Sequence, residues 1–85
     1  MIAGDMEPGR YYRIQGSIEY PEDSGAVIYT KPDQEVEVSP GGVFRVVDLV
    51  YHNTLAYPDG GFWIHELSTV EEMSQEEGVI YRIQR

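Results

Sequence analysis

The chain has 85 residues and carries fifteen acidic against six basic side chains, a net charge of −9, which disfavours direct contact with nucleic-acid phosphates and anionic membranes. The absence of cysteine excludes disulfides and thiolate metal sites, and we expect no cofactor. No apolar run approaches the ~20 residues of a membrane span, and a signal-peptide pattern is missing, so the sequence predicts one cytoplasmic domain over residues 1–85.

Turn signals recur at short intervals along the chain. Proline fixes φ at the first corner of a turn and glycine supplies positive φ later. Turns are predicted in this way at residues 6–9, 20–25, 31–33, 39–42 and 57–61. The runs between them are rich in β-branched and aromatic residues and predict strands at 10–18, 26–30, 34–38, 43–51, 61–67 and 79–84. Such strands indicate a mainly β fold, a small antiparallel barrel or sandwich of five to six strands.

Residues 69–77 depart from the strand pattern and predict a short helix. Thr69, with Glu72 three residues later, fits a capping box, and Gly78 is suited to end the helix. Glu76 and Glu77 oppose the helix dipole at the far end, so we expect about two turns.

The motif Tyr-Arg-Ile-Gln occurs twice, at residues 12–15 and 81–84. In an extended strand, the Tyr and Ile of each copy share one face while the Arg and Gln share the other. A half-buried strand needs this alternation, and four residues are too few to establish an internal duplication. We expect the two terminal strands to pair and close the sheet, with their arginines on the outer face near acids of adjacent strands.

Catalytic and metal-binding motifs are missing from the sequence. His52 and His65 belong to no spaced ligand motif, and a strand would point His65 and Glu66 to opposite faces. No serine lies in a Gly-x-Ser-x-Gly elbow. We therefore expect ordinary surface or turn histidines, no metal site and no enzyme.

The aromatic residues of the strand predicted at 61–67 indicate a binding surface. Phe62 and Ile64 share one face, and Trp63 and His65 share the other. If Phe62 and Ile64 fill the core, Trp63 is exposed near Tyr57, and such rings dominate interface hot spots. Both faces of this strand are apolar, so the opposite assignment, with Trp63 buried and Phe62 exposed, stays equally open.

The middle of the chain resembles an SH3-like small barrel in the broad sense. Residues 43–51 are apolar on both faces, which suits a bent strand shared by two sheets. The resemblance rests on Gly42-Val43-Phe44-Arg45-Val46-Val47-Asp48, on Gly61-Phe62-Trp63-Ile64-His65, and on the helical turn and final strand after them, and it covers residues 26–84. It implies binding of peptides, cell-wall fragments or nucleic acid through exposed aromatics, here Tyr29, Tyr57 and Trp63. The acidic-aromatic peptide-binding signature of eukaryotic SH3 domains is missing.

Two main functions compete. The first is a non-catalytic module that binds a protein partner through Trp63, Tyr57 and nearby acids. The alternative is an acidic inhibitor that mimics nucleic acid and occupies the basic groove of a nucleic-acid-binding enzyme; it rests on the acidic stretch between Val46 and Tyr81, which holds no Lys or Arg. A third hypothesis is a small-ligand-binding or catalytic site in the mouth of the barrel. The candidate partner-binding residues are Tyr29, Tyr57, Trp63, His65, Glu71, Glu72, Glu76 and Glu77.

Overall fold

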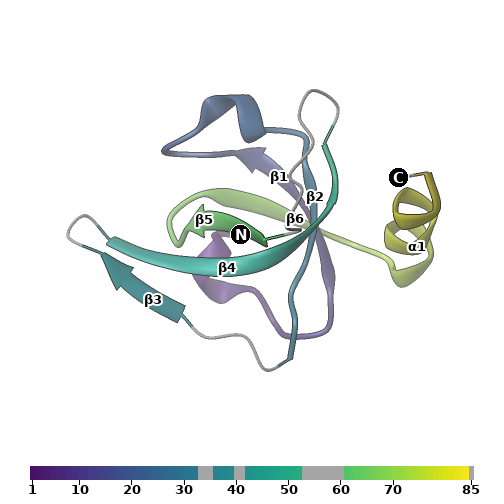
Figure 1. Cartoon of the computed structure of the whole chain (residues 1–85), viewed down its shortest axis with the longest axis horizontal. Helices are drawn as coiled ribbons and strands as arrows, with labels where there is room; N and C mark the ends of the chain where they lie inside the picture. The colour runs from purple at the N-terminus through teal and green to yellow at the C-terminus, as the bar shows by residue number, and fades with distance from the viewer. Residues whose placement is uncertain (33–35, 40–41, 53–60, 85) are drawn as a thin grey trace.

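The computed structural model describes residues 1–32, 36–39, 42–52 and 61–84. Over these residues the chain forms one curled antiparallel sheet, a half-barrel, with a helix packed against one face (Figure 1). The elements are η1 (Ala3–Asp5), β1 (Tyr11–Gly16), η2 (Pro21–Asp23), β2 (Val27–Tyr29), β3 (Val36–Ser39), β4 (Gly42–Tyr51), β5 (Gly61–His65), β6 (Thr69–Met73) and α1 (Gln75–Gln84). The predicted mainly β fold with one short helix is confirmed.

The long strand β4 joins the parts of the sheet. Residues 42–45 of β4 pair with β3, residues 44–48 pair with β5, and residues 48–51 pair with β2. From β2 the sheet continues through β1 to β6. Val47 and Leu49 face the inside of the curl while Val50 faces α1, so β4 buries apolar side chains on both faces. This agrees with the prediction of a bent, shared strand.

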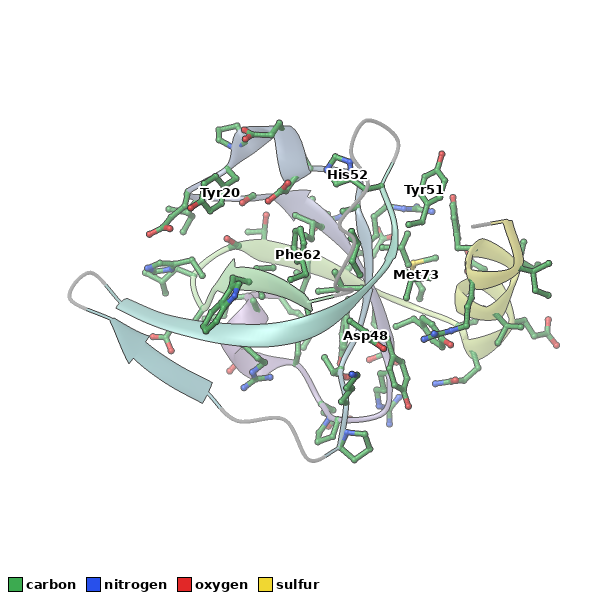
Figure 2. All side chains as sticks on the ribbon, in the orientation of Figure 1. Tyr20, Asp48, Tyr51, His52, Phe62 and Met73 are labelled. Atoms are coloured by element: carbon green, nitrogen blue, oxygen red, sulfur yellow. The ribbon has the colours of Figure 1, made fainter. Side chains whose placement is uncertain are left out.

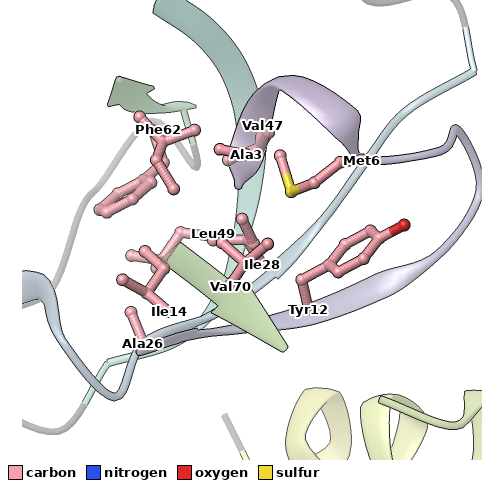
Figure 3. Close-up of a cluster of buried hydrophobic side chains, with 11 residues drawn as sticks. Ala3, Met6, Tyr12, Ile14, Ala26, Ile28, Val47, Leu49, Phe62 and Val70 are labelled. Atoms are coloured by element: carbon pink, nitrogen blue, oxygen red, sulfur yellow. The ribbon is translucent and has the colours of Figure 1, made fainter. Parts of the chain in front are cut away.

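The main core fills the inside of the curled sheet (Figure 3). Its members are Ala3, Met6, Tyr12, Ile14, Ala26, Ile28, Val47, Leu49, Phe62, Ile64 and Val70. Element η1 brings Ala3 into this core. The Ala3 N–H donates to the Ser68 carbonyl and the Gly4 N–H to the Glu66 carbonyl, each at 2.8 Å, so the N-terminal segment is held along the turn between β5 and β6.

A second cluster lies on the opposite face of the sheet, beneath α1. Tyr11, Val27, Val50 and Met73 are its buried members, with Tyr29, Tyr51 and Tyr81 packed against them. Figure 2 shows Tyr51 and Met73 on the side of the sheet that faces α1. Because neighbouring residues of a strand point to opposite faces, Tyr12 enters the main core while Tyr11 enters this cluster. Strand β1 is therefore covered on both faces.

The predicted helix at 69–77 and the predicted strand at 79–84 are wrong in position. Residues 69–73 form strand β6, and the helix begins at Gln75 and includes the second Tyr-Arg-Ile-Gln copy. Strand β1 pairs with β2 along one edge and with β6 along the other. No edge of β1 remains for another strand, so the predicted pairing of the two motif copies as strands does not occur.

The side chain of Ser74, not that of Thr69, caps the start of α1. Ser74 Oγ accepts a hydrogen bond from the Glu77 backbone N–H at 3.2 Å and donates to the Glu77 carboxylate at 3.4 Å. Ser74 and Glu77 have the same spacing as Thr69 and Glu72. The latter two residues lie in β6, where residues 69–73 pair with β1.

The predicted turns at residues 6–9 and 20–25 contain glycines at positive φ, Gly9 at 78° and Gly25 at 94°. The second turn is held by a buried pair. His52 Nε2 lies 3.3 Å from Asp23 Oδ1, and both side chains are almost fully covered. The pair ties η2 to the end of β4. Of the expected surface or turn position, the surface alternative is therefore wrong for His52, whose side chain is buried.

The Asp23–His52 contact gives a stability prediction. Replacing Asp23 by Ala removes an acceptor from a buried imidazole, so the free energy of unfolding should fall by about 1–3 kcal/mol. Glu22→Ala in the same turn changes an exposed side chain and should alter stability by less than ~0.5 kcal/mol. Urea unfolding monitored by circular dichroism measures both, and equal stability of the two variants would contradict a structural role for the pair.

Candidate functional site

Trp63 is exposed while its neighbours on β5 are buried. The exposed fraction is 44% for Trp63 but 3% for Phe62, and Ile64 is buried as well. Phe62 pairs across the sheet with Val47 and Trp63 with Val46, so alternation along β5 sends the indole outward. Of the two assignments left open by the sequence, the structure has the one with Trp63 outside.

Two other predicted residues, His65 and Tyr29, do not join Trp63 at the surface. His65 is buried, and its Nδ1 accepts a hydrogen bond from the Leu67 backbone N–H at 3.1 Å, so it supports the turn after β5. Of the expected surface or turn position, the surface alternative is wrong for His65, and the turn alternative agrees with this hydrogen bond. Tyr29 is half-buried, with its ring 4.9 Å from that of Tyr11 in the cluster under α1. Tyr57 lies outside the described residues.

Two of the four predicted glutamates contact side chains of β1 or of Arg10, the residue just before it. Glu72 Oε2 accepts a hydrogen bond from Arg10 at 2.9 Å, and this bond and the carboxylate charge raise the pKa of the Arg10 guanidinium. Glu71 lies 4.0 Å from Arg13 and accepts a hydrogen bond from Gln15 at 3.2 Å. All of these groups are partly exposed, so each pair adds little stability. Arg13 of β1 and Arg10 just before it thus contact acids of β6, although the strand pairing from which such contacts were expected does not occur.

The other two glutamates, Glu76 and Glu77, are exposed in the first turn of α1, where negative charge suits the helix dipole. They are remote from Trp63, because β5 and α1 lie toward opposite ends of the molecule (Figure 1). The described members of the predicted aromatic and acidic site therefore lie on separate elements, with Trp63 on β5, two glutamates on β6 and two on α1.

Helix α1 is docked on β1 by Gly78. A Cβ atom at this position would overlap the ring of Tyr11, so only glycine allows the helix backbone to approach this closely. A larger residue would have to push the helix off the sheet. Gly78, expected from the sequence to end a helix, lies instead within α1.

The two copies of the Tyr-Arg-Ile-Gln motif then help to hold α1 on the sheet, through one contact between the copies and one with Tyr11, just before the first copy. Arg13 donates a hydrogen bond to the Tyr81 hydroxyl at 3.0 Å, and Arg82 donates to the Tyr11 hydroxyl at 3.1 Å. The Arg82 guanidinium also lies 5.5 Å from the centre of the Tyr11 ring and 5.4 Å from that of Tyr29. These are cation–π distances. The repeated residues therefore fix the helix to the sheet by side-chain contacts rather than by strand pairing.

The outward face of α1 carries an apolar stripe that the sequence reading missed. Val79, Ile80 and Ile83 are all exposed. With Glu76 they have the spacing i, i+3, i+4 and i+7 of one helical face. This spacing and the Ser74–Glu77 box were the sequence signals that a helix continues through the second motif copy.

The described residues also bear on metal binding and on membrane insertion. Over residues 1–32, 36–39, 42–52 and 61–84, no group of three or more histidine, aspartate or glutamate side chains could hold a metal ion. Within the same residues, no helix has the length and apolar character needed to cross a bilayer. The cytoplasmic location stays a prediction of the sequence.

Comparisons with known proteins give no family. No family model matches the chain, and neither a curated protein nor a solved structure matches it.

The Gly78–Tyr11 contact gives a second stability prediction. Alanine favours an isolated helix over glycine by about 1 kcal/mol, yet Gly78→Ala should destabilise the protein by about 1–3 kcal/mol, because the new methyl group overlaps the Tyr11 ring. Val79→Ala, one residue along and outward-facing, should change stability by about 0.5 kcal/mol or less. Urea unfolding compares them, and a Gly78→Ala protein more stable than the parent would contradict this docking.

Proposed function

We propose that this protein is a non-catalytic interaction module that binds a protein partner through the outer surface of β5, with Trp63 as the central contact. The observation that carries the proposal is the 44% exposure of Trp63 beside the buried Phe62 and Ile64. Tryptophan supplies a large contact area with few rotatable bonds, and it is enriched among the residues that dominate binding energy.

The packing and strand pairing of β5 hold Trp63 in place and favour binding with little rearrangement. Phe62 and Ile64 anchor β5 in the main core, and residues 61–65 of β5 pair along β4. A side chain held on such a strand loses little conformational freedom when a partner covers it. The indole is thus pre-positioned.

We also propose that the half-barrel is SH3-like in the broad sense. The long strand β4 shared by β2, β3 and β5 supports this, as does the hairpin-like pairing of β4 with β5. The three-turn length of α1 departs from the single helical turn usual in that class. A fold of this kind is compatible with many functions, so the proposal about function rests on Trp63 alone.

The acidic nucleic-acid mimic is the less favoured function. A mimic needs free carboxylates placed where phosphates would lie, and Glu71 and Glu72 already have arginine partners, Arg13 and Arg10. Binding of a mimic would weaken steeply with salt, whereas binding centred on an indole should depend on salt only modestly.

The proposal predicts a partner whose capture depends on Trp63. Tagged protein is incubated with nuclease-treated lysate of the source organism, and the proteins retained at low and moderate salt are identified. Trp63→Ala should reduce capture of the specific partner at least about tenfold. Tyr20→Ala is the matched control, because Tyr20 is also an exposed ring and lies on a different segment.

Folding must be separated from binding in this experiment. Trp63→Ala should leave unfolding nearly unchanged, while Phe62→Ala should cost about 3–5 kcal/mol because it opens a cavity in the core. Partners retained equally by the parent and by Trp63→Ala would contradict the proposal. Retention only of nucleic-acid enzymes, lost at moderate salt, would favour the mimic.

A further inference from the structure

Helix α1 reverses the usual orientation of an amphipathic helix. In a helix packed on a protein core, the apolar stripe normally faces inward. Here Ile80 and Ile83 are 54% and 77% exposed, and Val79 beside them is exposed too. The side chains turned to the sheet are instead those of Tyr81 and Arg82, together with the bare backbone of Gly78.

This orientation does not result from poor docking of the helix. The inward face is occupied by Gly78 against Tyr11, by Arg82 over two tyrosine rings, and by Tyr81, whose ring lies 5.2 Å from that of Tyr51. Gln75 adds a hydrogen bond of 3.0 Å to the Gly9 carbonyl. A rotation of the helix that buried Ile80 would break these contacts. It would also place a larger side chain against the Tyr11 ring, where only glycine fits. The apolar stripe is therefore held toward solvent.

We propose that the outer face of α1 is a second docking surface, and that its occupant is the apolar face of a basic amphipathic helix in a partner protein. The surface consists of Val79, Ile80 and Ile83, with Glu76 at its N-terminal end. A shallow, mostly apolar depression lined by Gln75, Glu76, Val79 and Ile80 lies toward its N-terminal end. Helix recognition of this kind uses apolar anchors spaced by three or four residues.

Charge complementarity identifies the chemistry of the occupant. Glu76 borders the depression, Glu77 is exposed beside it, and the chain as a whole carries a charge of −9. Over the described residues Glu71 and Glu72 have arginine partners, but no ion pair involves Glu76. Lysine or arginine residues flanking the apolar face of a partner helix would meet this carboxylate and would also speed association.

A second copy of the chain fits this surface less well. Three apolar side chains are far fewer than the roughly 20–30 residues that each partner contributes to a stable interface. Two copies would also bring like charges together, since each has a net charge of −9. An anionic membrane is disfavoured by the same charge.

This surface is independent of Trp63, because β5 and α1 lie toward opposite ends of the molecule (Figure 1). The two proposals can therefore fail separately. Loss of Trp63 should leave binding at α1 intact, and loss of Ile80 should leave binding at β5 intact.

The test uses a fluorescent synthetic peptide of leucine and lysine, about 14 residues or four helical turns long, with leucines at positions i, i+3, i+4 and i+7. Fluorescence anisotropy measures its binding to the full chain. Ile80→Gln and Ile83→Gln should each weaken binding about tenfold. Leu67→Gln is the matched control, since Leu67 is 52% exposed against 54% for Ile80 but lies after β5; its effect should be small.

Two further peptides separate apolar docking from simple charge attraction. A peptide of the same composition in scrambled order keeps the charge but loses the apolar face, and a leucine–glutamate peptide reverses the charge; both should bind at least about tenfold more weakly. Equal binding of the scrambled peptide, or no effect of Ile80→Gln, would overturn the proposal. A dimer seen by sedimentation in the parent and lost in Ile80→Gln would overturn it in favour of a second copy.

Discussion

The burial of both faces of strand β1 is the constraint on which the rest of the structure depends. Tyr12 enters the main core and the next residue toward the N-terminus, Tyr11, enters the cluster on the opposite face. Both edges of β1 are also paired, with β2 and with β6. A strand enclosed on four sides needs a second layer above the sheet, and α1 is that layer. The half-barrel alone would leave Tyr11 in water.

The way in which α1 provides this layer explains its surface. The helix covers tyrosine rings, and its inward side is built from a glycine, a tyrosine and an arginine. Cation–π contacts of this kind are worth roughly 0.5–2 kcal/mol each, and the hydrogen bonds to tyrosine hydroxyls add about 1 kcal/mol each. Docking is thus achieved with polar-aromatic contacts. The branched aliphatic residues are left on the outside, where they are available to another protein.

Much of the half-barrel could be predicted from local sequence, because alternation and turn chemistry act over a few residues. Strands β1, β2 and β4 and the turns at Gly9 and Gly25 follow from such signals. The segment from residue 69 onward could not be assigned in this way. It contains two residue pairs with capping-box spacing and a motif that alternates like a strand. The choice between them depends on which segment pairs with the free edge of β1. Tertiary contacts, and not the local sequence, therefore decide which of these structures forms.

The candidate site, like the fold, could be predicted only in part from the sequence. The exposure of Trp63 depends on which face of an apolar strand meets the core, and only the pairing of Phe62 with Val47 decides it. The apolar stripe on α1 was concealed by the incorrect assignment of residues 79–84 as a strand. The contact that covers Tyr29 comes from Arg82 of the same helix, so it too could not be predicted.

Nuclear Overhauser effects from Gly78 test the docking of α1 on β1 most directly. We predict contacts between the Gly78 Hα protons and the Tyr11 ring, with an upfield shift of at least one Hα caused by the ring face. Helical contacts should run through residues 75–84. Cross-strand Hα–Hα contacts between residues 79–84 and residues 10–16, with Gly78 at an ordinary shift, would contradict both the enclosed strand and the outward stripe.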